Sequence, residues 1–227
     1  MLATPRAWSF IYLPNFKDKD YCGRYLRVFF EYSEPTLLHL SLPNETYNAA
    51  NWLEFKVPRI IREVLDCIQC LTLSAWHLFF FVFLQEWSTF EHLQQLELTG
   101  GHASSIDLGL LTRQQFPVLQ SLHWPSLRFG VRCKSSSTFA DFIPLQHIFL
   151  GLDHEFQWVL LLQACVAMLN GLEIRGNVNE IEPVITVGTV TLLVLQFLHL
   201  NYDLWRGYAG LPFKLVTPAL TCVEMGS

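Results

Sequence analysis

The chain has 227 residues, a formal net charge of −5, a hydrophobic share of 51% and a charged share of 15%. This length suits one domain or one repeat array with a buried core, and the scattered basic residues lack the stripe typical of nucleic-acid-binding proteins. A mean hydropathy of +0.28 leaves two classes open, a membrane protein and an unusually apolar repeat fold.

Cysteine usage and the N-terminus both point to a reducing compartment. Six cysteines in a chain of this length are too few for a disulfide framework and favour reduced thiols. The opening MLATPRAWSF is interrupted by Pro5 and Arg6, so it does not resemble a signal peptide. We therefore expect a cytoplasmic or nuclear protein.

The first predicted element in chain order is a helix over 21–32, and a repeated apolar motif follows it. The motif is an apolar residue, two free positions, a second apolar residue, one free position and a third apolar residue. Its copies are Leu37, Leu40 and Leu42; Ile68, Leu71 and Leu73; Leu93, Leu96 and Leu98; Leu119, Leu122 and Trp124; Leu145, Ile148 and Leu150; Leu169, Leu172 and Ile174; Leu195, Leu198 and Leu200; and Leu220, Val223 and Met225.

The regular spacing of these copies indicates that the motif is a true repeat and not a set of chance matches. They start near 37, 68, 93, 119, 145, 169, 195 and 220, so the steps are 31, 25, 26, 26, 24, 26 and 25 residues. Trp8, Ile11 and Leu13 form a weaker first copy within 1–36. A period near 25 lies within the range of leucine-rich repeats, about 20–29 residues. The sequence therefore predicts a single array over 1–227.

The predicted fold is an α/β leucine-rich-repeat solenoid. Its spaced apolar residues would form the core, and a curved parallel sheet would line the concave side. Helices and irregular returns would occupy the convex side. We expect helices over 57–67 and 155–168, a surface return with a short helical turn over 131–144, and an irregular return over 201–218.

Residues between the apolar positions should face outward on the concave sheet, which is the surface that solenoids offer to proteins. The predicted partner-binding residues are His39, Gln95, Glu97, His123, His147, Phe149, Glu173, Phe197, His199 and Glu224. The predicted lining also includes Ser41, Cys70, Thr72, Ser121, Gly171 and Cys222. Phe149 and Phe197 stand out because exposed aromatic residues are enriched at binding hot spots.

Several phrases, in order along essentially the whole chain, resemble one protein family. They begin with Thr4, Pro5, Arg6, Trp8 and Ser9, and continue with LRVFFEYS at 26–33 and LLHLSL at 37–42. FEHLQQLELTG at 90–100 and LLQACVAMLNGLEIRG at 161–176 follow, and then 190–200 and 216–225. Together they resemble the leucine-rich-repeat region of the F-box proteins of mushroom-forming fungi.

The resemblance implies the substrate-recognition part of a ubiquitin-ligase receptor of the Skp–cullin–F-box type. The family's F-box would precede residue 1, so no residue of this chain is expected to dock the Skp-type adaptor. That adaptor would be a partner only if an upstream F-box exists. The expected function is a non-enzymatic protein-binding scaffold, with an unknown protein partner and no cofactor.

Two other functions compete with the scaffold. The stretches 67–84 and 183–200 each hold 18 positions without a formal charge, which is near the minimum for a membrane-spanning helix. A small two-span membrane protein is therefore the alternative. A hydrolase or redox enzyme would depend on Cys67 or His123, but the CxxC at Cys67 and Cys70 lacks a second ligand pair and no hydrolase or nucleotide motif occurs.

Two histidines and a glutamate are candidates for a metal site on the concave face. His123 and His147 could be neighbours beside Glu97, because adjacent strands lie about 4.8 Å apart. Polar residues on a solvated sheet face explain these side chains more simply, and no metal is expected.

Overall fold

The structure is a computed structural model that describes residues 9–12, 19–33, 36–41, 61–74, 89–99, 111–124, 143, 145–152, 158–176, 189–201 and 214–226. The chain divides into two compact units. Unit 1 is Met1–Gly100 with Gln114–Leu119, and unit 2 is Gly101–Arg113 with Gln120–Ser227. We describe each unit by itself.

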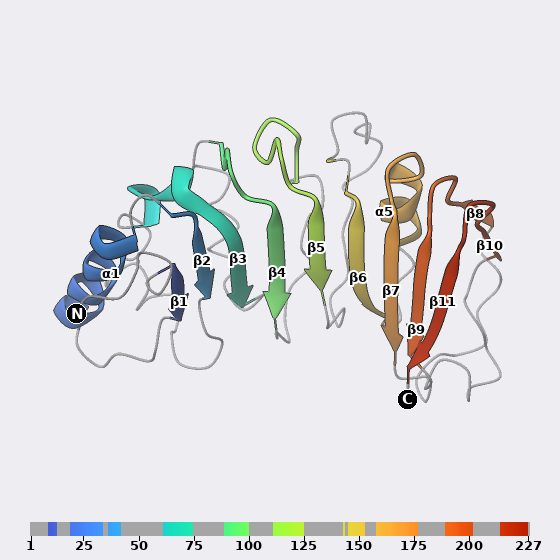
Figure 1. Cartoon of the computed structure of the whole chain (residues 1–227). Coiled ribbons are helices and arrows are strands. Elements are labelled where there is room, and N and C mark those ends of the chain that lie inside the picture. Colours follow the sequence, from blue (N-terminus) through green and yellow to red (C-terminus); the bar gives the residue numbers. More distant parts are fainter. Residues whose placement is uncertain are drawn as a thin grey trace. The chain divides into compact units, whose positions relative to one another are not determined.

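Unit 1 holds a parallel sheet whose strands follow chain order. The strands are β1 (Phe10–Tyr12), β2 (Leu38–Ser41), β3 (Ile68–Ser74) and β4 (Gln95–Thr99), as Figure 1 shows. Every pair is parallel, so after each strand the chain must return to the end of the sheet at which that strand began. This winding is that of a solenoid. The weaker copy at Ile11 belongs to the array, because Ile11 pairs with Leu40.

Unit 2 repeats the arrangement with a second, smaller sheet. Its main sheet runs β5 (Ser121–Trp124), β6 (His147–Leu152), β7 (Gly171–Gly176), β9 (Phe197–Asn201) and β11 (Cys222–Gly226), all parallel. The smaller sheet pairs β8 (Thr189–Thr191) with β10 (Lys214–Val216), also in parallel. One prediction was wrong in part: the return over 201–218 was expected to be irregular, but residues 214–216 form the strand β10. The remainder, 202–213, lies outside the described residues.

Strand pairing follows the period read from the sequence. Cys70 lies opposite His39 and Gln95, which are 31 and 25 residues away along the chain. In unit 2, His147 lies opposite Ser121 and Gly171, and Phe197 opposite Gly171 and Cys222. For these outward residues, the sequence separation between paired residues equals the separation between successive motif copies. The prediction of a parallel solenoid is therefore confirmed.

Helices are few in the described residues. α1 spans Lys19–Ser33 and includes the predicted range 21–32, with Leu26, Phe30 and Ser33 buried at helical spacing. Within the predicted helix 155–168, α5 spans Trp158–Ala164 and residues 165–168 form turns, while 155–157 lie outside the described residues. Of the predicted helix 57–67, residues 57–60 lie outside the described part, residues 61–62 are helical and the 3₁₀ helix η2 spans Leu65–Cys67. Of the return at 131–144, only residue 143 is described.

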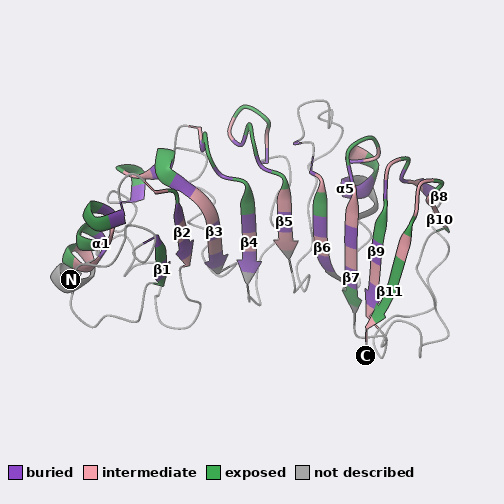
Figure 2. Ribbon diagram, in the orientation of Figure 1, coloured by how far each residue is buried: buried purple, intermediate pink, exposed green. Residues whose placement is uncertain are grey.

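The core of each unit is built from strand residues that alternate with less buried ones (Figure 2). In unit 1 the paired row Ile11, Leu40, Leu71 and Leu96 is at most 1% exposed. In unit 2 the row Leu122, Ile148, Leu172 and Leu198 is at most 7% exposed. Side chains alternate along a strand, so the motif's apolar positions share one face and exclude water together.

The first full repeat departs from the motif by one residue. The motif places Leu37 inward, but Leu37 is 36% exposed and Leu38 is 1% exposed. Leu38 pairs with Ile68, whereas His39 pairs with Cys70, so the register shifts between Leu38 and His39. Two residues of β3 thus span one step of β2, which is the geometry of a β-bulge. The extra residue lies in β3, and in β2 it is Leu38 rather than Leu37 that faces the core.

The structure does not support the two-span membrane alternative. The described parts of the two apolar stretches contain strands, namely β3 at Ile68–Ser74, β8 at Thr189–Thr191 and β9 at Phe197–Asn201. Residues 75–84 and 183–188 lie outside the described part. Among the described residues, no helix is both long and apolar enough to span a bilayer.

Candidate binding surfaces

The strand side chains that alternate with the core form the outward face of each unit. In unit 1 the face has two rows in register across β1 to β4. One row is Phe10, His39, Cys70 and Gln95, and the other is Tyr12, Ser41, Thr72 and Glu97. Parallel strands lie about 4.8 Å apart, so each row spans about 14 Å. Residues from four distant parts of the sequence therefore meet on one surface.

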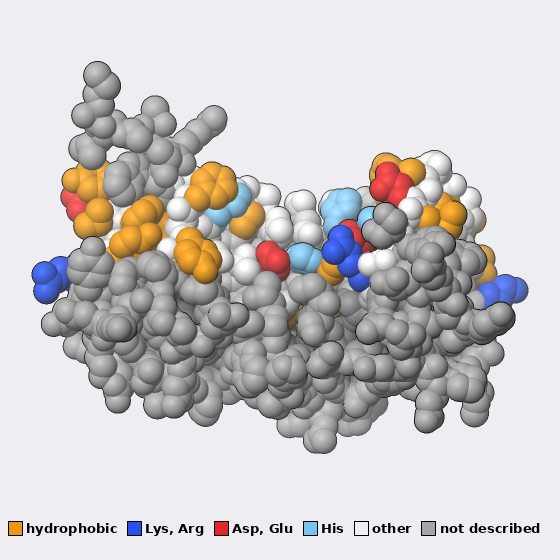
Figure 3. Space-filling view, turned by 90° about the horizontal axis from the view of Figure 1, so that it is seen from below, with side chains coloured by type: hydrophobic (Ala, Val, Ile, Leu, Met, Phe, Trp, Pro, Cys, Tyr) orange, Lys and Arg blue, Asp and Glu red, His pale blue; other side chains and the backbone are white. Residues whose placement is uncertain are grey.

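A groove of about 360 Å³ lies on the outward face of unit 1. Its lining contains both rows, with Ile11 and Leu40 beneath them. The largest exposed side chains are Phe10, 66% exposed, and Tyr12, 60% exposed, both on β1. Figure 3 shows hydrophobic side chains gathered beside a histidine over these N-terminal strands. The volume lies near the lower end for ligand sites, about 300–1,000 Å³.

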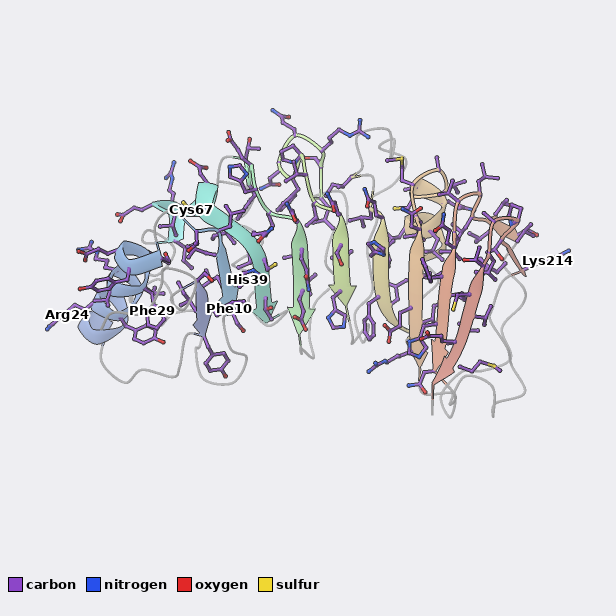
Figure 4. The ribbon with its side chains drawn as sticks, in the orientation of Figure 1. Phe10, Arg24, Phe29, His39, Cys67 and Lys214 are labelled. Atoms are coloured by element: carbon purple, nitrogen blue, oxygen red, sulfur yellow. The ribbon has the colours of Figure 1, made fainter. Side chains whose placement is uncertain are left out.

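His39 contacts both the aromatic side of the groove and the thiol of Cys70. The rings of Phe10 and His39 have centroids 4.5 Å apart, and the two residues lie side by side in Figure 4. The Nε2 of His39 is 4.0 Å from the Sγ of Cys70, and that thiol donates a weak hydrogen bond to Oε1 of Gln95 at 3.9 Å. The Phe10 row is therefore continuously in contact.

Burial raises the pKa of the Cys70 thiol. A cysteine nucleophile or metal ligand reacts as the thiolate, which a raised pKa disfavours near neutral pH. Cys67, the other cysteine of the CxxC, is exposed at the end of η2 where β3 begins (Figure 4). Cys70 is thus a polar contact in the groove, and its burial favours the protonated thiol.

Glu97 forms the acidic side of the groove. The Oγ1 of Thr72 donates a hydrogen bond to Oε2 of Glu97 at 3.1 Å. Glu97 is the one Asp, Glu, Lys or Arg among the described residues that line the groove. The groove is therefore aromatic along β1 and negatively charged along β4.

The outward face of unit 2 also has two rows. The first is His123, Phe149, Glu173, His199 and Glu224, and the second is Ser121, His147, Gly171, Phe197 and Cys222. In the first row, His123 and Phe149 meet edge to face with ring centroids 3.9 Å apart. Edge-to-face contact is a favoured geometry for aromatic pairs.

Arg175 joins the first row of unit 2 to its charged groups. Its guanidinium carbon is 5.0 Å from the ring centroid of Phe149, a cation–π distance. Its Nε donates to Oε1 of Glu173 at 3.0 Å, and Nδ1 of His199 is 3.5 Å from the same oxygen. A basic side chain beside histidines is visible here in Figure 3. Contacts thus run from β5 to β9.

Two glycines make room for histidine rings on this face. A Cβ on Gly171 would lie 2.6 Å from Nδ1 of His147, and one on Gly226 would lie 2.7 Å from Nε2 of His199. Real Cβ atoms do not approach other heavy atoms so closely. Each ring therefore leans over a neighbouring strand where only glycine leaves space.

All ten predicted binding residues occupy outward strand positions. His39, Gln95 and Glu97 line the groove of unit 1, and the other seven lie in the two rows of unit 2. Phe197 is 54% exposed, as its motif position predicts, whereas Phe149 is partly covered by His123 and Arg175. Whether these residues bind a partner stays a prediction.

Three surface residues were missed by the sequence analysis. Phe10 and Tyr12 flank Ile11 in the weak first copy, so the alternation of that copy could have identified them. Arg175 follows Ile174 at the next outward position of β7, beyond the motif's last apolar residue. Extending the alternation by one residue past the motif would have found it.

The two histidines of the metal alternative lie in different rows of unit 2. His147 pairs with Ser121, and His123 pairs with Phe149, so the two histidines are offset along their strands rather than opposite each other. Within the described ranges, no group of three or more His, Cys, Asp or Glu side chains is arranged to hold a metal ion.

Comparisons with known proteins gave no match among family models, curated proteins or solved structures.

Proposed function

We propose that the chain is a non-enzymatic protein-binding scaffold that holds its partner on the outward faces of its parallel strands. The observation that carries the proposal is the alignment of outward side chains in register, with a groove in unit 1 and a contact chain in unit 2. Solenoids use such surfaces for proteins, and exposed Tyr12 and Phe197 are residue types enriched at binding hot spots.

The finer form of the proposal is a leucine-rich-repeat solenoid whose outward face is the concave side. The 25-residue period and the resemblance to fungal F-box proteins support it, together with the parallel pairing. In that form the chain corresponds to the substrate-recognition part of a ubiquitin-ligase receptor. Docking to a Skp-type adaptor would then depend on an F-box encoded ahead of Met1.

Affinity capture with matched variants tests the scaffold proposal. Tagged wild-type chain, Tyr12→Ala, Glu97→Lys and Phe197→Ala are used to capture proteins from a fungal lysate, with quantitative mass spectrometry as the readout. Tyr32→Ala on α1 and Glu91→Lys before β4 are controls, because both residues are exposed and lie off the outward face. Circular dichroism establishes that each variant is folded.

We expect at least one protein to be lost from the outward-face variants and kept by both controls. Truncating a hot-spot aromatic residue typically weakens binding about tenfold or more. A set of captured proteins that is the same for all folded variants, or that changes only with the controls, would refute the proposal.

The receptor form has a separate test. An in-frame F-box in the transcript upstream of Met1, whose product co-precipitates with a Skp-type adaptor, would support it. A transcript without an F-box, or a product that does not co-precipitate, would exclude the receptor form and leave the scaffold proposal standing.

A further inference from the structure

The main sheet of unit 2 ends in an edge strand, β11, which pairs with β9 on one side (Figure 1). On that side the N–H of Cys222 donates to the carbonyl of Gln196 at 2.9 Å. Backbone groups point alternately to the two sides of a strand, so those of Val223 and Met225 point to the other side. Within the described part of the chain, no residue pairs with the backbone groups on this open side.

The apolar core is also incomplete at this edge. Val223 and Met225 occupy apolar positions of the motif, yet they are 52% and 66% exposed, and Figure 2 shows exposed residues along β11. On β9, Leu198 and Leu200 are 7% and 6% exposed, whereas their partners on β7 are at most 2% exposed. The edge therefore combines unpaired backbone groups with uncovered apolar side chains, and a further strand would satisfy both.

The edge strand of unit 1 differs, because a helix contacts it. The carbonyl of Ser9 accepts a hydrogen bond from the N–H of His39 at 2.7 Å, so the carbonyl of Tyr12 points away from β2. That carbonyl accepts a hydrogen bond from the hydroxyl of Tyr25 on α1 at 3.3 Å. Ile11, the core residue of β1, is 1% exposed. A second copy of the chain therefore finds a free strand at β11 and an occupied one at β1.

We propose that two copies of the chain pair through β11, with the two strands antiparallel about a two-fold axis at Glu224. Residues directly opposite each other in an antiparallel pair point to the same face. This register sets Val223 of each copy against Met225 of the other, and their open backbone groups hydrogen-bond across the axis. The same patch is used by both copies, so the contact forms a closed dimer and not a filament.

The pattern of side chains in β11 selects this register. Centring the axis on Val223 or on Met225 pairs that residue with its own counterpart and leaves the other apolar residue opposite a polar one. Only the axis at Glu224 covers both apolar side chains with apolar partners. Glu224 then lies opposite its own counterpart, and like charges in that position weaken the pairing.

Single cysteine substitutions in the full chain test both the contact and its register. Glu224→Cys places two thiols directly opposite each other, where Cα atoms lie about 4.5–5.5 Å apart, a separation that a disulfide spans. In the matched variants Val223→Cys and Met225→Cys, the new thiol faces an apolar side chain of the second copy. Each protein is oxidised mildly, dimers are measured on a non-reducing gel, and mass spectrometry locates the disulfide.

We expect a disulfide-linked dimer from Glu224→Cys, joined through position 224 of both copies, and no self-linkage at positions 223 and 225. Circular dichroism establishes that each variant is folded. Linkage at 223 or 225, or the absence of linkage at 224, would overturn the inference.

The charge at position 224 gives a second test that needs no oxidation. Glu224→Gln should tighten the dimer about two- to fivefold in sedimentation velocity at low salt, because it removes a pair of like charges. Glu224→Lys mixed with the wild-type chain should form mixed dimers in preference to either homodimer. Glu91→Lys makes the same charge change at an exposed residue before β4, so its mixture with the wild-type chain should show no such preference.

Random mixing of Glu224→Lys with the wild-type chain, or a wild-type chain that stays monomeric at every concentration, would contradict the dimer. The inference goes beyond the proposed function and does not depend on it. A dimer whose outward-face variants capture the same proteins as the wild-type chain would leave the inference standing and refute the scaffold proposal. A monomer whose outward-face variants lose a captured protein would do the reverse.

Discussion

Among single residues, Cys165 has the environment with the clearest chemical consequence. It is fully buried in unit 2, directly after α5. Burial raises the pKa of its thiol from 9.0 to about 12, and a hydrogen bond with the backbone of Leu145 acts weakly in the opposite direction. The folded chain therefore keeps this thiol protonated at pH values where an unfolded chain would ionise it.

This difference predicts a loss of stability at alkaline pH. The stabilising contribution is complete below about pH 9 and is lost as the pH rises toward the folded value of about 12. Across that window the free energy of unfolding should fall by about 1.4 kcal/mol per pH unit from this group. Urea denaturation at several pH values should show a steeper fall for the wild-type chain than for Cys165→Ala.

Cys67→Ala is the matched control for Cys165→Ala, because Cys67 is exposed. Its stability should follow the wild-type curve with pH. Parallel curves for the wild-type chain and Cys165→Ala would show that burial does not hold the Cys165 thiol protonated.

Gly171 permits a second prediction at this scale. The Cβ of Gly171→Ala would press on the ring of His147, a surface side chain that can rotate away. We expect unfolding free energy to change by less than about 1 kcal/mol while the ring moves. The His147 ring signals in NMR spectra should shift and those of His199 should not, with the reverse for Gly226→Ala. Unchanged His147 signals would contradict the close approach.

At the scale of elements, the register shift in β2 makes a testable distinction between adjacent leucines. Leu38 is 1% exposed and Leu37 is 36% exposed. Leu38→Ala should destabilise the chain by about 2–5 kcal/mol, the usual cost of truncating a buried leucine. Leu37→Ala should cost less than about 1 kcal/mol. Denaturant unfolding of the two variants checks this, and a larger cost at Leu37 would restore the uniform motif.

The sequence predicted strand positions well because one physical rule repeats in every copy. An apolar residue must face the core at each step, so the 25-residue period sets the phase of strands such as β4 and β9. The register shift between Leu38 and His39 was not predicted, because Leu37 and Leu38 are equally apolar. Only the pairing of Leu38 with Ile68 distinguishes the two leucines. The strand at 214–216 was missed because it lies outside the motif.

The candidate surfaces were predictable only as lists of outward residues. Alternation placed His123, Phe149 and Glu173 on one face, but their contacts depend on which row pairs with which. The stacking of Arg175 on Phe149 depends on side-chain conformations that no spacing encodes. The groove likewise depends on which large and small outward residues lie next to each other on neighbouring strands. That order can be read only after the strands are aligned.

At the scale of the whole molecule, one apolar edge of unit 2 has consequences in solution. Val223 and Met225 on β11 are 52% and 66% exposed, although the motif assigns them to the core. Strand edges with exposed apolar residues favour association. Val223→Thr with Met225→Lys should therefore reduce self-association in sedimentation velocity experiments at unchanged unfolding free energy. A wild-type chain that is monomeric throughout the concentration range would contradict this.

The central claim is that partners bind the outward faces of the parallel strands, and site-specific photo-crosslinking tests it most directly. Benzoyl-phenylalanine is placed singly at Tyr12 and Phe197 on the outward faces, and at Tyr32 and Met168, which are exposed elsewhere. The claim predicts that the two outward positions crosslink to a protein that the other two positions do not reach. Crosslinks to that protein from Tyr32 or Met168, with none from Tyr12 or Phe197, would contradict it.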